Sequence, residues 1–142
     1  MQQILREKLW TYIVQNNPDL MIRLQETHGV TKYLTEKVNT MMPLVAELLS
    51  ESKPQYIIEE LCLSNLTKEL RPSRFLYIRS VLEEEFVTDY ERLRESGTLT
   101  YEIINMMEAC KDIFDELQFS SENEEERYIR YAIIGQVHDY LN

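Results

Sequence analysis

The chain has 142 residues, of which 44% are hydrophobic and 28% charged, and its formal net charge is −10. This composition is that of a folded globular protein rather than a disordered one, and the length fits one domain. The acidic balance argues against direct binding of nucleic acid, because phosphates repel such a surface.

Turn-forming residues are scarce, with only three glycines and four prolines. A sheet protein needs more of them, so we expect an all-α fold: a single-domain helical bundle of about six to seven helices over residues 1–142. Uncharged runs such as residues 38–46 and 131–137 are too short to cross a membrane, and the N-terminus lacks a signal-peptide pattern. Cys62 and Cys110 have no CxxC neighbour and favour reduced core thiols. Together these features predict a cytoplasmic protein that does not bind membranes.

Apolar residues at helical spacing predict the elements of the first half of the chain. The first helix covers residues 3–15, and Asn17 caps a short second helix that begins with a proline. Thr31 is the predicted cap of a third helix. Pro43 interrupts this third helix, so we expect a kink or a break near residues 40–42. A fourth helix follows the Ser-Lys-Pro sequence at residues 52–54 and ends near residue 70.

The second half begins with a long predicted helix that is capped by Ser73 and ended by Gly97. Thr100 is the predicted cap of the next helix, which carries a regular apolar stripe to about residue 117. Ser121 starts a capping-box pattern before the last helix.

That last helix contains two features that compete with helix formation. Residues 128–134 have the β-propensity of a strand, but a single strand would have no partner, so we predict a helix. Gly135 weakens a helix by about 1 kcal/mol relative to alanine, which suggests a close contact between helices at this point. The sequence shows no internal repeat.

Residues that carry catalysis are few and separated. His28 and His138 lie near predicted helix ends, and no nucleophile is selected beside either. HExxH, ExxH and CxxC patterns are absent, and isolated glycines exclude a phosphate-binding loop. The sequence therefore predicts a protein that is not an enzyme and that holds no metal or cofactor. One alternative stays open: Glu85 and Asp89 would share a helical face and form an acid/base pair.

Charge is distributed unevenly along the chain. Residues 1–80 contain ten Lys/Arg and nine Asp/Glu, whereas residues 81–142 contain five and 16. A basic segment surrounds the predicted helix start at Ser73, where an anion or a partner would bind; the reading we favour is that these cations pair with the acidic helices. The candidate patch is Arg71, Ser73, Arg74 and Arg79, and the candidate acidic face is Glu83, Glu84, Asp89 and Glu91.

Some of these segments resemble a known family. The sequences Leu70-Arg71-Pro72-Ser73-Arg74-Phe75 and Leu82-Glu83-Glu84-Glu85-Phe86, with Leu9-x-x-Tyr12 before Pro18 and Phe114-Asp115-x-Leu117 before the last helix, carry the resemblance. The family consists of uncharacterised small all-helical proteins from Bacteroidetes-type anaerobes, often encoded on conjugative mobile elements. The pattern covers nearly the whole chain but consists of core positions, and Pro43 and the extra acidic residues depart from it. The resemblance implies an all-helical fold and assigns no activity or functional residue.

These observations favour a non-catalytic protein-interaction or regulatory module that contacts a partner protein or a second copy of the chain. Nine tyrosines suit an interface, although tyrosine also rims helical cores. Two alternatives remain: an acidic decoy that mimics nucleic acid and occupies a DNA-binding protein, and an enzyme with an unrecognised carboxylate site.

Overall fold

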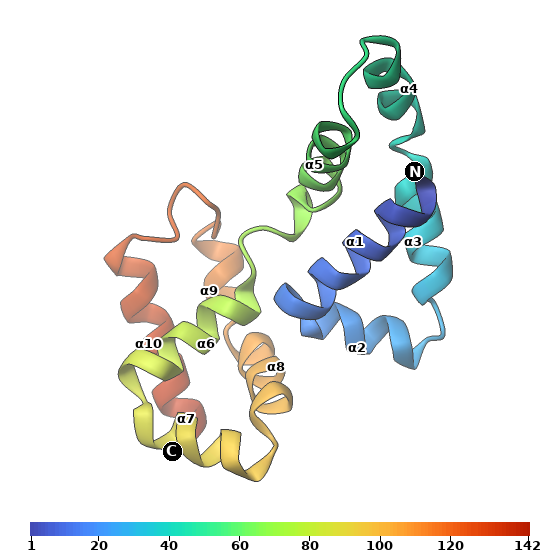
Figure 1. The fold of residues 1–142 in the computed structure, drawn as a ribbon. Helices are drawn as coiled ribbons and strands as arrows, with labels where there is room; N and C mark the ends of the chain where they lie inside the picture. The colour runs from blue at the N-terminus through green and yellow to red at the C-terminus, as the bar shows by residue number, and fades with distance from the viewer. The chain divides into compact units, whose positions relative to one another are not determined.

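The computed structural model describes residues 1–142 and contains ten α-helices, one short 3-10 helix and no strand (Figure 1). The predicted all-α class is confirmed, and residues 128–134 are helical as expected. There are more helices than predicted because three of the predicted helices are each divided in two. The chain forms two compact units, residues 1–70 and 71–142, which are described separately below.

The first unit encloses its own hydrophobic core. Its elements are α1 (Gln2–Asn16), α2 (Pro18–Glu26), α3 (Val30–Asn39), α4 (Met42–Ser50), α5 (Gln55–Leu66) and the 3-10 helix η1 (Lys68–Leu70). Buried side chains from all five α-helices meet in the core: Leu5, Leu9, Ile13, Leu20, Leu34, Val38, Val45, Leu48, Ile58, Cys62 and Leu66. A polar contact also ties the first helix to the last, because Lys8 Nζ lies 3.3 Å from Glu59 Oε1.

Two prolines set helix starts in the first unit. Pro18 and Pro43 each lie in the first turn of a helix, where the missing N–H costs no intrahelical hydrogen bond. The interruption expected at Pro43 is a break, since α3 ends at Asn39 and α4 begins at Met42. Asn17 occupies the predicted cap position of α2, but its side chain does not cap that helix. Its Nδ2 instead donates to the carbonyl oxygen of Leu70 at 3.4 Å.

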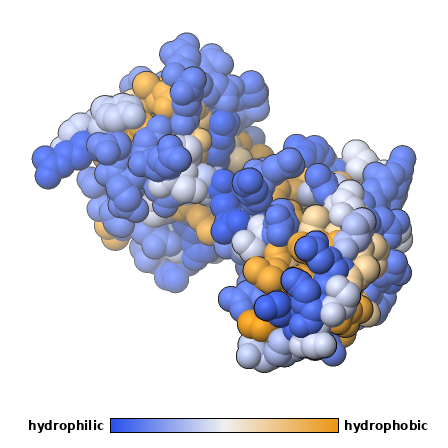
Figure 2. Space-filling model, turned by 90° about the horizontal axis from the view of Figure 1, so that it is seen from above, coloured by the Kyte–Doolittle hydropathy of each residue, from blue (hydrophilic) through white to orange (hydrophobic).

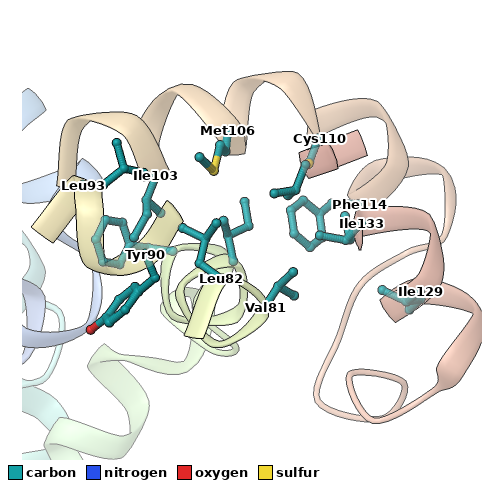
Figure 3. Packing of buried hydrophobic residues seen from close by; sticks show 13 residues of the cluster. Val81, Leu82, Tyr90, Leu93, Ile103, Met106, Cys110, Phe114, Ile129 and Ile133 are labelled. Atoms are coloured by element: carbon teal, nitrogen blue, oxygen red, sulfur yellow. The ribbon is translucent and has the colours of Figure 1, made fainter. Parts of the chain in front are cut away.

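The second unit has a separate core. Its elements are α6 (Arg74–Glu85), α7 (Val87–Ser96), α8 (Leu99–Ala109), α9 (Lys111–Glu116) and α10 (Arg127–Leu141). Figure 3 shows Phe114 among Cys110, Ile133 and the other buried residues of this core. The ring of Phe114 is fully buried. Its centre lies 4.8 Å from the centre of the Phe119 ring and 5.9 Å from that of the Tyr77 ring.

The prediction of one long helix after Ser73 is wrong, because the chain bends at Phe86 between α6 and α7. Phe86 has φ −133° and ψ 53°, outside the helical region. Three consecutive glutamates, residues 83–85, precede this bend, and negative charge is unfavourable at a helix C-terminus. The new start places Asp89 in the first turn of α7, where the same dipole favours it. Gly97 ends α7 as predicted, with φ 76°.

The cap at Ser73 is confirmed, because its Oγ accepts a hydrogen bond from the Leu76 N–H at 3.1 Å. The caps predicted at Thr31 and Thr100 are wrong: α3 begins at Val30 and α8 at Leu99, so both threonines lie inside their helices. The cap predicted at Ser121 is also wrong, since α10 begins at Arg127. The Asn123 side chain organises this loop instead. Its Oδ1 accepts from the Ser120 N–H at 2.7 Å, and its Nδ2 donates to the Leu117 carbonyl oxygen at 3.1 Å.

The two units share most of their helix–helix contacts, although α8 also packs against α9 and α10. In each unit the first helix packs against the second, third and fifth, the second packs against the third, and the fourth packs against the fifth. Thus α1 to α5 correspond to α6 to α10. The bend after the first helix also matches: Asn17 has φ −134° and ψ 61°, nearly the angles of Phe86, and the two residues are 69 positions apart.

The same offset of 69 holds at the turn between the second and third helices. The Gly29 N–H donates to the Leu24 carbonyl oxygen at 2.8 Å, and 69 residues later the Thr98 N–H donates to that of Leu93 at 3.1 Å. The residue before each donor has a positive φ, 56° at His28 and 76° at Gly97. The offset persists to the starts of the fourth helices, Met42 and Lys111. The structure therefore reveals an internal repeat that the sequence analysis missed.

The fifth helices follow the same repeat with a slightly different offset. Both bury three residues spaced four apart, which are Ile58, Cys62 and Leu66 in α5 and Ile129, Ile133 and Val137 in α10. These residues are 71 positions apart. The change in offset is consistent with the lengths of the elements between them, because α9 is shorter than α4 and the loop before α10 is longer than the loop before α5.

Candidate interaction surface

The predicted basic patch is largely occupied by contacts inside the second unit. Arg74 Nη2 donates to Asp115 Oδ1 at 2.8 Å, and its guanidinium lies 5.0 Å from the centre of the Phe114 ring. Arg79 Nε donates to Glu83 Oε1 at 2.9 Å, and its Nη2 donates to the Tyr90 hydroxyl at 3.3 Å. Of the other two members, Ser73 caps α6 and Arg71 is exposed just before it.

These contacts shift the acid–base properties of their partners. Hydrogen bonds from Arg74 and then Lys111 lower the pKa of the Asp115 carboxyl group, since both favour its charged form. The hydrogen bond with Tyr90 raises the pKa of Arg79. The arginines of the patch therefore link α6 to α7 and α9 within the unit.

The predicted acidic face is neutralised locally. Glu83 pairs with Arg79, and Glu84 pairs with Arg130 of α10. Asp89 and Glu91 pair with Arg92 at 3.0 Å and Arg94 at 2.6 Å. Every member of the candidate acidic face thus has a cationic partner in the same unit.

The proposed acid/base pair of Glu85 and Asp89 does not share a continuous helical face. The bend at Phe86 separates the end of α6 from the start of α7, and Asp89 is paired with Arg92. The prediction that these two carboxylates lie on one face is therefore wrong, because it assumed an unbroken helix.

The two thiols are buried and unpaired, one in each core. Burial raises the pKa of both thiols, that of Cys110 to about 11, because the apolar surroundings disfavour the thiolate. No group of three or more His, Cys, Asp or Glu residues is placed to hold a metal ion. The buried position of the cysteines confirms their assignment to the core.

The most exposed aromatic face of the second unit lies on α10. Tyr128 and Tyr131 are 52% and 64% exposed, and Gly135 and His138 continue the same face at helical spacing. The buried residues of α10 lie on its opposite side. Figure 2 shows that hydrophobic patches interrupt a mostly hydrophilic surface on the side of the molecule in view.

A groove of about 690 Å³ runs beside this face, between α10 and the bend at the end of α6. It is lined by Glu85, Phe86, Tyr131, Ala132, Ile134, Gly135, Gln136, His138 and Asp139. We call this groove together with Tyr128 the α10 surface. The number of tyrosines in the sequence suggested an interface, but the groove could not be predicted, because its wall depends on the bend at Phe86.

The charges of the α10 surface are acidic and almost unpaired. Glu85 takes part in no ion pair, and no lysine or arginine lines the groove. His138 Nδ1 lies 3.8 Å from Asp139 Oδ1, which is an ion pair only when the imidazole is protonated. The groove thus has apolar side chains between two carboxylates.

A second groove, of about 510 Å³, lies in the first unit between α1 and α3, beside Trp10 and Leu34. Three of its polar side chains, those of Gln3, Arg6 and Glu7, are bonded to one another. Arg6 Nη2 donates to Gln3 Oε1 at 2.8 Å, and Gln3 Nε2 donates to Glu7 Oε1 at 2.9 Å. This groove therefore offers fewer unsatisfied groups to a partner than the α10 surface does.

No family model matches the chain, and no curated protein or solved structure is significantly similar to it. The resemblance to the helical family of Bacteroidetes-type anaerobes therefore stays a prediction. None of the helices combines the length and hydrophobicity that crossing a membrane requires.

Proposed function

We propose that the protein is a non-catalytic protein-interaction or regulatory module whose contact surface is the α10 surface. The observation that carries this proposal is the exposed pair Tyr128 and Tyr131 beside an open groove. Exposed tyrosines are enriched at protein interfaces, because they bury a large area and retain a polar end. The groove volume lies within the range of about 300–1,000 Å³ that is common for binding clefts.

The remaining surface supports a role without catalysis. The four carboxylates of the candidate acidic face are paired with arginines, and both thiols are buried with raised pKa values, which makes them poor nucleophiles. Two buried free thiols also suit a reducing compartment, so we propose the cytoplasm as the location.

The acidic decoy is less well supported. A mimic of nucleic acid needs carboxylates that present uncompensated charge in a continuous array. Glu83, Glu84, Asp89 and Glu91 instead have arginine partners. Residues 71–142 still carry eight Lys/Arg and 16 Asp/Glu. This acidic excess is better suited to selecting a basic protein partner.

A site-specific photocrosslinker tests the proposal. The photoreactive residue replaces Tyr131, and in a matched control it replaces Glu60, the corresponding residue of α5, which is also exposed. We expect a crosslinked protein in the source cells from position 131 and none from position 60, followed by reconstitution of the complex from purified components. If position 131 gives no adduct, or both positions give the same adducts, the proposal is contradicted.

A further inference from the structure

The fold itself does not explain the presence of Gly135. A glycine inside a helix destabilises it relative to alanine. The sequence suggested a close helix–helix contact as the reason, but this is wrong: a Cβ at Gly135 would meet no atom within 4 Å. Glycine is otherwise used where another backbone or ligand approaches closely. Gly135 lines the groove, where the lack of a side chain keeps the groove open.

In the first unit, the bend between the first and second helices is covered by another part of the chain. Asn17, which corresponds to Phe86, is only 8% exposed and donates to the carbonyl oxygen of Leu70, so the chain that follows α5 covers this bend. In the second unit α10 continues to Leu141, and Phe86 lines an open groove. At positions corresponding to Tyr131 and Gly135, α5 carries Glu60 and Ser64. On this side the first unit has a smaller groove, of about 310 Å³, between α1 and α5 beside Leu63, which corresponds to Ile134. The larger groove at the bend, with its two carboxylates, belongs to the second unit.

The chemistry of the groove selects its occupant. Phe86, Ala132 and Ile134 provide an apolar surface, and Gly135 has no side chain to fill the space beside them. Glu85 and Asp139 add two carboxylates, with no lysine or arginine among the lining residues to neutralise them. An apolar segment without charge would leave these carboxylates unpaired, and an acidic segment would be repelled.

We propose that the groove binds a basic amphipathic segment of a partner protein, with an apolar side chain packed on Phe86 beside Gly135 and with lysine or arginine residues facing Glu85 and Asp139. This inference rests on the proposed function and adds the chemistry of the partner. The net charge of −8 over residues 71–142 favours the approach of such a segment from a distance.

The test uses fluorescence anisotropy with the full chain and two labelled helical peptides. Both peptides have leucines on one face; one has lysines beside them and the other has glutamates at the same positions. The variants are Gly135→Trp, which fills the groove, Gly135→Ala, which leaves it nearly open, and Ser64→Trp, which places the same side chain at the matched position of the first unit. Circular dichroism and urea unfolding of each variant establish that the fold is retained.

We expect the lysine peptide to bind the wild-type chain at least tenfold more tightly than the glutamate peptide does. Gly135→Trp weakens this binding at least tenfold, whereas Gly135→Ala and Ser64→Trp change it less than threefold. Equal binding of the two peptides, no binding of the lysine peptide, or equal loss in the two tryptophan variants overturns the proposal. A crosslink from position 131 to a protein partner, combined with failure of the lysine peptide, rejects only the basic chemistry. Absence of both rejects the proposed function as well.

Discussion

Replacing Phe114 by alanine tests whether the two units unfold independently. Phe114 lies entirely within the core of the second unit, so the substitution should destabilise that unit alone. Its side chain is fully buried and contacts the rings of Tyr77 and Phe119. Truncation of a buried phenylalanine costs about 3–5 kcal/mol. Tyr77 and Phe119 are only partly buried and are free to move toward the vacated volume. We therefore expect a value near the lower limit, about 3 kcal/mol.

Each unit contains one buried thiol, and these thiols report the opening of the two units independently. Cys110 reacts slowly in the folded protein because it is buried and its pKa is raised to about 11. A loss of about 3 kcal/mol increases the open population, and hence the rate of alkylation, by about a hundredfold. Peptide mass spectrometry after timed alkylation measures Cys110 and Cys62 in the same sample.

We expect Phe114→Ala to accelerate alkylation of Cys110 and to leave that of Cys62 within about twofold. The matched control is Val45→Ala, 69 residues earlier, in the core of the first unit. It removes two methyl groups, so we expect a loss of about 2 kcal/mol that accelerates Cys62 alone. Equal acceleration of both thiols by either variant shows that the chain unfolds as one cooperative body, contrary to the two separate cores.

Three further changes test particular contacts. Gly135→Ala stabilises the second unit by up to about 1 kcal/mol in urea unfolding, because the position is helical and open; a loss of stability shows a contact that the structure lacks. Arg130→Met removes the bonds to Ser80 and Glu84 and lowers stability by about 1 kcal/mol or less at low salt; if the loss does not shrink in 1 M salt, the effect is not electrostatic. The pKa of Asp115 is lowered in the folded state, so its stabilising effect is complete above the unfolded pKa and is lost as the pH falls through the folded pKa. Stability measured from pH 6 to pH 2.5 therefore declines less steeply in Asp115→Asn, and parallel curves contradict the role of its arginine and lysine partners.

The fold class followed from local signals in the sequence, and so did several boundaries. Ser73 and Gly97 mark a helix start and a helix end by local hydrogen bonding and by a left-handed backbone, and both effects act within a few residues. Pro43 interrupts a helix for an equally local reason. The sequence around Phe86 contains no proline or glycine that would indicate a break. The apolar periodicity therefore predicted a helix that continues through this residue. The Asn123 loop likewise displaced the start of α10 through side-chain bonds that a capping pattern does not reveal.

The internal repeat escaped sequence analysis because the two units conserve geometry rather than residue identity. Asn17 and Phe86 share a backbone conformation but no side-chain chemistry. Lys8 pairs with Glu59 between the first and last helices of one unit, whereas in the other the cation is Arg130 on the last helix and the anion is Glu84 on the first. The groove was hidden for the same reason, since it appears only when the bend at Phe86 is known and the two units are compared.

A reversal of charge in the groove tests whether Glu85 and Asp139 select the partner. The double variant Glu85→Lys and Asp139→Lys changes only exposed side chains, so the fold and the apolar surface stay intact. We predict that it binds the glutamate-bearing peptide more tightly than the lysine-bearing one, the reverse of the wild-type preference, and that the difference shrinks as salt is added. An unchanged preference for the lysine peptide contradicts recognition by these two carboxylates.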